Sequence, residues 1–539
     1  MVIANAANRV IWYSPIQQRT KEKRIAARTQ PTPATSKGID FAQKELVNRT
    51  HPAHPLRNWF LVPLLSLLLA LAAVAQQAPT QTPPQQPGPE KVSPPPQAPQ
   101  GQDQTIVPRE HHLSQAEAEQ LFKSLDDILA FVSKDSGLPI KEPIKRRLVT
   151  REEVGAFLEK RMKEDKDAEK LEKSETSLKK FRLLPRDFDL RSFMLTLMKE
   201  QVAGYYDPKT KTVNMLDWVD AEEQKPVMAH ELTHALQDQN YDMEKWMEAG
   251  GKPRNIQEEI EQDERRGARE AVIEGQGMIV LLDYMLRAYK IRVTDAPQFV
   301  GMMRAGMGGG DISGSPVFSK APLFLRDSLM FPYSDGMNFV LQVELKRGTE
   351  GGFAGLLTNP PTTTRNIMEP QTYLSGETVP NVKVADLDKV LGKKWQRWDY
   401  GFMGEYDVQL MFKQWLNTET ADAISPSWRG GYYLSYKEPG TKVGSDGKLD
   451  EANMAMVYVS KWASPDAAKL FADDYAKALQ KRYSKLTATK PLGQGTRGEW
   501  MTEEGPVIIE LRGDSAFVSE SFDPATADKL RDAVFAEIE

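Results

Sequence analysis

Cysteine is absent from this chain of 539 residues, and histidine occurs only six times. Without cysteine the chain can form no disulfide, offer no thiolate to a metal ion and carry no lipid anchor on a cysteine. A surplus of positive charge is also missing, because 70 Lys and Arg face 75 Asp and Glu, for a formal net charge of -5. With this balance, and no basic stripe in the globular part, we expect no nucleic-acid partner.

A long uncharged apolar run stands near the N-terminus, at residues 59–75 (WFLVPLLSLLLALAAVA). It is shorter than the about 20 residues that a membrane-spanning helix needs. It ends on Ala73-Val74-Ala75, a pattern typical of signal-peptide cleavage sites. We therefore predict a cleaved signal peptide, or alternatively a signal anchor that attaches the protein to the membrane. Both interpretations predict export, to the periplasm or cell envelope of a bacterium or to its exterior.

The residues on either side of this run have unusual compositions. Residues 1–58 form a basic tail that is too long for the start of an ordinary signal peptide. Either the true translation start lies near Leu56, or the tail is a cytoplasmic segment before a signal anchor, as the positive-inside rule allows. Residues 76–108 are rich in proline and glutamine, which predicts a disordered linker.

The globular part divides into three regions by pattern. Residues 109–200 predict a helical N-terminal region, in which Ser114 and Glu117 form a capping box. Residues 201–400 begin with a predicted β-hairpin, in which Tyr205-Tyr206 pairs with Val213 to Leu216. Residues 401–539 mix strand and helix patterns and predict a small α+β C-terminal module. The expected fold class is therefore α+β, rich in helices.

The stretch AHELTHALQD, residues 229–238, contains candidate metal-binding and catalytic residues. On an α-helix His230 and His234 lie one turn apart on the same face, so both can bind one zinc ion. Glu231 then lies beside the metal, where it can accept a proton from water and pass it to a leaving amine. Pro226 is expected in the first turn of this helix.

The third metal ligand must be a carboxylate, because no histidine follows His234. Candidates stand on the next long helix, where Glu270 and Glu274 share a face at a spacing of four residues. One of them could bind the metal while the other orients a histidine.

HELTHALQD resembles the active-site helix of thermolysin-type gluzincins, in which an aspartate follows the second histidine by four residues; Asp238 matches it. REAVIE resembles their downstream Glu-Ala-x-x-Asp, which implies Glu270 as the ligand. IEG instead resembles the Asn-Glu-Gly of aminopeptidase gluzincins, which implies Glu274.

A broader resemblance covers residues 180 to 440, carried by EQVAGYYDP, HELTHALQDQ, VIEGQG, FPYSDGMNFV, NPPTTT and EPQTYL. Together these motifs resemble a family of bacterial exported proteins of the peptidase-MA-like gluzincin type. The resemblance implies a zincin-like metallopeptidase domain at 201–400, with Glu274 as the ligand and Asp238 and Glu270 in support. One departure is Glu369-Pro370, which stands where the family often has His-Pro.

A peptidase also needs a group that stabilises the oxyanion of its tetrahedral intermediate. With no further histidine, a tyrosine or arginine must serve. We expect Tyr333, at the start of a helix opened by Pro332; Tyr206 and Tyr373 are alternatives.

The sequence therefore predicts an exported metallopeptidase with one zinc ion per chain, acting on a peptide or protein. His230, His234 and Glu274 bind the ion, and Glu231 is the general base. The alternative from another class is an inactive envelope scaffold with a structural metal site, against which the intact Glu231 argues. Zinc-dependent hydrolysis of a non-peptide amide is a third option.

Overall fold

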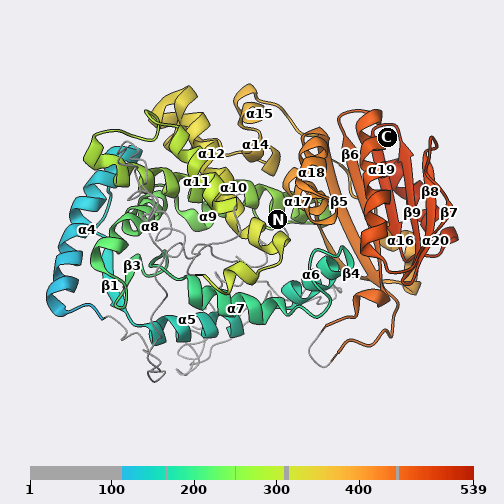
Figure 1. Ribbon diagram of the computed structural model, residues 1–539, viewed down its shortest axis with the longest axis horizontal. Helices are drawn as coiled ribbons and strands as arrows, with labels where there is room; N and C mark the ends of the chain where they lie inside the picture. Colours follow the sequence, from blue (N-terminus) through green and yellow to red (C-terminus); the bar gives the residue numbers. More distant parts are fainter. Residues whose placement is uncertain are drawn as a thin grey trace, which may run out of the picture.

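The structure is a computed structural model that describes residues 112–164, 168–248, 250–308, 315–380, 382–444 and 448–538. The predicted basic tail, signal segment and linker, residues 1–108, lie outside these ranges. Helices and strands both contribute to the described part (Figure 1), which confirms the α+β class. Among the described residues, no helix combines the length and apolarity needed to cross a membrane.

Four helices make up the N-terminal region: α4 (Gln115–Ser136), α5 (Arg151–Glu164), α6 (Ala168–Lys180) and α7 (Leu190–Gln201). The predicted capping box is confirmed, because the Ser114 hydroxyl accepts from the Glu117 amide and the Glu117 carboxylate accepts from the Ser114 amide. Leu121, Leu125, Ile128 and Val132 of α4 are buried. They give the helix one apolar face, which packs toward α8.

A three-stranded sheet lies beside these helices, formed by β1 (Lys145–Val149), β2 (Tyr205–Asp207) and β3 (Thr212–Leu216). β3 is central, parallel to β1 and antiparallel to β2. The predicted hairpin is confirmed, with Tyr206 opposite Val213. β2 is therefore an edge strand of this sheet.

Three long helices form the centre of the molecule: α8 (Ala221–Tyr241), α10 (Ile256–Leu286) and α12 (Leu323–Glu350). α10 packs against both of the others. Its approach to α12 depends on glycine, because a Cβ at Gly275 would lie 2.3 Å from the Gly336 carbonyl oxygen, and one at Gly336 would lie 2.1 Å from the Ala271 carbonyl oxygen. The glycines of VIEGQG and FPYSDG thus let the two backbones touch.

Both helix starts predicted from proline are wrong. α8 begins at Ala221, where the Asp220 side chain caps the amides of Glu222 and Glu223, so Pro226 lies inside the helix. α12 begins at Leu323, so Pro332 is also inside its helix and Tyr333 is in the middle. An internal proline removes one backbone hydrogen bond. In α12, buried residues on both sides of Pro332 continue the helix across it. In α8 the turn before Pro226 is held by the Asp220 cap and by Gln224, whose buried side chain bonds the backbone of Leu216 and Val219.

Shorter elements complete the central part: α9 (Met243–Met247), α11 (Gln298–Gly308), the π-helical turn η3 (Gly351–Gly355), α13 (Leu356–Thr358), α14 (Thr364–Met368), α15 (Pro370–Ser375) and α16 (Leu387–Leu391). η3 follows α12 directly and packs against its end.

The C-terminal part is a seven-stranded sheet in the order β4-β5-β6-β10-β9-β8-β7, with every neighbouring pair antiparallel. Its strands are β4 (Gln396–Phe402), β5 (Trp428–Lys437), β6 (Met454–Trp462), β7 (Leu486–Lys490), β8 (Arg497–Thr502), β9 (Gly505–Arg512) and β10 (Ser515–Glu520). The predicted boundary at residue 401 falls inside β4.

Helices cover both faces of this sheet. The accompanying helices are α17 (Glu405–Trp415), α18 (Thr418–Ile424), α19 (Pro465–Arg482) and α20 (Pro524–Ile538). Tyr458 of β6 packs in one hydrophobic cluster with α19, whereas its neighbours Val457 and Val459 pack in a second cluster with α20. Side chains alternate between the faces of a strand, so α19 and α20 lie on opposite faces. Ser464 caps α19 and Pro465 is its first residue, as the sequence predicts.

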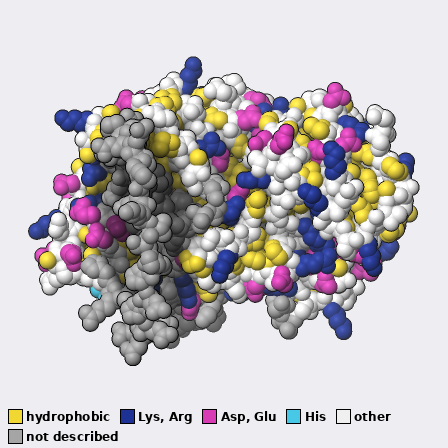
Figure 2. Space-filling view, in the orientation of Figure 1, with side chains coloured by type: hydrophobic (Ala, Val, Ile, Leu, Met, Phe, Trp, Pro, Cys, Tyr) yellow, Lys and Arg dark blue, Asp and Glu magenta, His cyan; other side chains and the backbone are white. Residues whose placement is uncertain are grey.

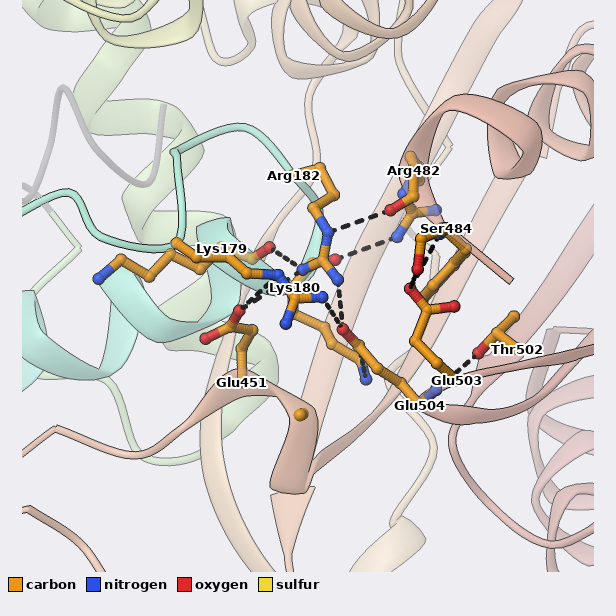
Figure 3. A network of polar contacts seen from close by, with 12 residues as sticks. Lys179, Lys180, Arg182, Glu451, Arg482, Ser484, Thr502, Glu503 and Glu504 are labelled. Atoms are coloured by element: carbon orange, nitrogen blue, oxygen red, sulfur yellow. Dashed lines mark hydrogen bonds and ion pairs between the residues drawn. The ribbon is translucent and has the colours of Figure 1, made fainter. Parts of the chain in front are cut away.

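A polar network joins the end of α6 to the sheet (Figure 3). The Lys180 ammonium lies 2.9 Å from Glu504 and is fully buried, and Arg182 pairs with the same carboxylate. The Arg482 guanidinium donates to the Lys180 carbonyl oxygen at 3.2 Å. These contacts fix the N-terminal helices to the C-terminal sheet. On the outer surface, Lys and Arg side chains lie among Asp and Glu across the face shown in Figure 2.

Candidate metal centre

α8 and α10 bring the predicted metal ligands together. Among the described residues, one group of at least three His, Asp or Glu could hold a metal ion: His230, His234 and Glu274. We call these three residues the metal group. Their ligand atoms all lie within 4.8 Å of one another, and all three side chains are buried. Glu270 is buried as well, one turn earlier on α10, but is not a member of this group.

The distances fit a single ion. The two Nε2 atoms of His230 and His234 are 2.9 Å apart, and the Glu274 Oε2 lies 3.1 Å from the first and 3.5 Å from the second. Ligand atoms held about 2.0–2.1 Å from one tetrahedral ion lie about 3.3 Å from each other. The three separations therefore differ from this value by at most a few tenths of an ångström.

The electrostatics of the group are strongly coupled. Burial would raise the pKa of Glu274, but His234 and His230 outweigh it and hold the pKa at about 2. Burial would lower the pKa of His234, but Glu274 raises it to about 9. Burial and the nearby His234 lower the pKa of His230. The two pKa values move in opposite directions because a positive charge on one ring disfavours a second positive charge on the ring in contact with it.

Glu231 is held by the edge strand. Its Oε2 accepts a hydrogen bond from the Tyr206 backbone amide at 2.9 Å. Burial raises the pKa of Glu231 to about 8, against the attraction of His234. The hairpin thus holds the predicted general base through a backbone amide, a contact that no side-chain motif in the sequence reveals.

Tyr333 lies at the site although its predicted place on the helix is wrong. Its ring stacks on His230, with centroids 6.3 Å apart and planes inclined by 26°. Burial and then Glu274, with which the hydroxyl forms a hydrogen bond, raise the pKa of Tyr333 well above its usual value. The close contact of α10 with α12 places it there. Tyr373 instead donates its hydroxyl to the Asn359 carbonyl oxygen.

Asp238 supports the surroundings of the site. Its carboxylate accepts from the Tyr206 hydroxyl at 2.8 Å and the Met243 amide at 3.2 Å, and it pairs with Lys211. It therefore ties the β-hairpin and α9 to α8. The residue in contact with the outer nitrogen of His234 is Gln237, whose Oε1 lies 2.9 Å from Nδ1.

Gln237 and Gly277 were not anticipated from the sequence. Gln237 follows His234 by three residues, so its position on the same buried helix face was available as a signal. Gly277 lies against the ring of His230, and a Cβ there would be 2.6 Å from its Nδ1 and Cε1 atoms. The second glycine of VIEGQG thus makes room for the His230 ring.

Comparisons with known proteins concern mainly the other end of the chain. No curated protein and no solved structure gave a match. Residues 393–531, which contain all seven strands of the large sheet and none of the three metal-group residues, match a family model described as a domain of unknown function (DUF8575).

Proposed function

We propose that the protein is a zinc-dependent metallopeptidase whose residues 201–400 form a zincin-like domain of the gluzincin type. The observation that supports this most directly is the convergence of His230, His234 and Glu274. Glu231 follows the first histidine, is fixed by the Tyr206 amide, and interacts electrostatically with His234 and Glu274. A purely structural metal site has no need of that additional carboxylate.

Two imidazoles and one carboxylate are a donor set that suits zinc and leaves a position open for catalysis. His230 and His234 would bind one ion through Nε2, and Glu274 through its carboxylate. When bound, the ion supplies Lewis acidity, which lowers the pKa of water toward neutrality and polarises a carbonyl group.

Glu231 acts as general base and then as general acid. The Tyr206 amide holds its Oε2, which orients the carboxylate while the other oxygen takes a proton from the attacking water. The same carboxyl group then gives that proton to the nitrogen of the leaving amine. The edge strand β2 thus fixes the position of the base through a backbone amide.

Tyr333 is the proposed oxyanion donor. Its pKa lies well above the usual value, so the hydroxyl keeps its hydrogen and remains a donor. Its place above His230 and beside Glu274 puts that donor at the metal group. On the sequence of residues 59–75 we also propose export, so that the substrates are peptides or proteins outside the cytoplasm.

The test pairs zinc content with peptide cleavage in Glu231→Gln and in Glu222→Gln, an exposed control on the same helix. We expect about one zinc per chain in the wild type and both variants. Cleavage of a peptide mixture, followed by mass spectrometry, should fall at least about 100-fold in Glu231→Gln only. Bound zinc without cleavage in the wild type would reject the enzyme and favour the scaffold.

A further inference from the structure

A chain of three buried side chains leads from the π-helical turn η3 to the metal group. We propose that Gln276 is a positioning residue that acts through Gln237 to keep the hydrogen of the His234 ring on Nδ1, leaving Nε2 free to bind the metal. This inference rests on the proposed function, in that His234 is taken as a metal ligand. Gln237 and Gln276 are both 0% exposed, so water cannot replace either of them.

The first link fixes the orientation of Gln276. Its Nε2 donates to the carbonyl oxygens of Gly352 at 2.8 Å and Phe353 at 3.1 Å. A carbonyl oxygen can only accept, so the amide must present its NH2 group to η3. Its oxygen then faces the opposite way, toward α8.

The second link transfers this orientation to Gln237. The Gln276 Oε1 accepts from the Gln237 Nε2 at 2.8 Å, and the same nitrogen lies 3.3 Å from the Ile273 carbonyl oxygen. Because both of these oxygens can only accept, the NH2 group of Gln237 must face them. The Oε1 of Gln237 is therefore turned to His234.

The third link selects the tautomer. The Gln237 Oε1 lies 2.9 Å from the His234 Nδ1 and can only accept, so Nδ1 must carry a hydrogen. A neutral imidazole has one ring hydrogen, and Nε2 is then a lone pair that can bind a metal. If either amide were reversed, an NH2 group would face Nδ1 and favour hydrogen on Nε2, which blocks binding.

The carbonyl groups at the far end are placed by the close packing of η3. A Cβ at Gly351 would lie 2.3 Å from the Arg347 Cβ, and one at Gly352 would lie 2.9 Å from the Glu344 Cβ. These glycines let the π-helical turn fold tightly onto the end of α12. π-Helical turns recur at functional sites of proteins. Here the carbonyl groups of the turn fix the orientation of the Gln276 amide and, through it, that of the Gln237 amide.

The test is a double-mutant cycle on zinc affinity, measured by competition with a chelator. Gln276→Met should weaken zinc binding about 10-fold, the range typical of residues that orient a ligating histidine. In a Gln237→Met background residue 237 makes no hydrogen bond to Gln276 or to His234, so the link between them is absent. There, adding Gln276→Met should change the affinity by less than about twofold.

Equal weakening in both backgrounds would show that Gln276 only supports packing, and no weakening in either would also overturn the proposal. A wild type that binds no zinc would contradict the proposed function instead. The positioning role is then decided on the metal-free wild type by 15N NMR of the histidine rings, at a pH where His234 is neutral. Hydrogen on Nδ1 is expected, and hydrogen on Nε2 would overturn the proposal.

Discussion

Two glutamates, Glu520 in the large sheet and Glu274 in the metal group, are similarly buried but have different partners. Glu520 accepts from Arg482 with both oxygens at 2.9 Å, from the Tyr475 hydroxyl at 2.6 Å and from the Tyr483 hydroxyl. Each of these donors carries its own hydrogen, and the arginine balances the charge. The cluster around Glu520 is therefore complete without a ligand.

Glu274 is surrounded differently. Its nearest partners include two imidazole Nε2 atoms that also contact each other, and a ring nitrogen donates only if it carries a hydrogen. The pKa does not separate the two glutamates: burial opposes ionisation in both, while Arg482 lowers the pKa of Glu520 and the histidines lower that of Glu274. The difference is geometric, because the atoms around Glu274 converge on one point whereas those around Glu520 form closed pairs.

The largest loss of stability is expected from a substitution that breaks the closed cluster around Glu520. Glu520→Gln leaves the fully buried Arg482 without its counter-charge, which should reduce the free energy of unfolding by about 3–5 kcal/mol. Zinc content at a temperature where the variant is folded should stay unchanged. Chemical denaturation measures the loss, and Asp532→Asn, at an exposed ion pair, should change stability by less than about 1 kcal/mol. A loss of zinc in folded Glu520→Gln would contradict the claim that the cluster around Glu520 is independent of metal binding.

A third cluster sharpens the comparison, because it has more carboxylates than cations but its atoms do not form a metal group. Asp135, Asp283 and Glu344 all pair with Arg292. Burial and then Asp135 raise the pKa of Asp283 to about 8. The folded state thus holds a proton that the unfolded state loses near its ordinary pKa of about 4.

Stability should therefore fall as pH rises from about 4 to 8, by at most about 1.4 kcal/mol per pH unit from this cluster. Asp283→Asn, which imitates the protonated carboxyl, should flatten that dependence in denaturation curves taken across the range. An unchanged slope would mean that Asp283 is ionised in the folded protein.

The smallest expected effect concerns the space around His230. Gly277→Ala places a Cβ 2.6 Å from the ring, which must shift and should weaken zinc binding about 10-fold in chelator competition. Gly301→Ala is the matched control, because a Cβ on that α11 glycine meets nothing within 4 Å. It should leave zinc affinity unchanged and stabilise the helix by up to about 1 kcal/mol. Equal zinc affinity in both variants would contradict the ring contact.

The sequence predicts the parts of this site that depend on local spacing. His230, Glu231 and His234 follow from helix periodicity, and the hairpin follows from strand patterning. Periodicity places Glu270 and Glu274 on one face without choosing between them, and the packing of α10 on α8 brings Glu274 into the group. That choice depends on where two helices cross, which no local pattern contains.

Other features depend on contacts between distant residues. Pro332 was expected to begin a helix because proline is common there, but burial on both sides carries α12 through it. The Tyr206 amide on Glu231 is a backbone contact across 25 positions. The orientation of Gln276 depends on carbonyl groups more than 70 residues later.

The most direct test is the zinc content per chain of the purified wild type, His234→Ala, Glu274→Ala and Glu270→Ala, with folding checked by circular dichroism. We predict about one zinc in the wild type and in Glu270→Ala, and little or none in the other two. Zinc retained in Glu274→Ala and lost in Glu270→Ala would show that Glu270, and not Glu274, is the third ligand. No zinc in the wild type after reconstitution would contradict the metal centre itself.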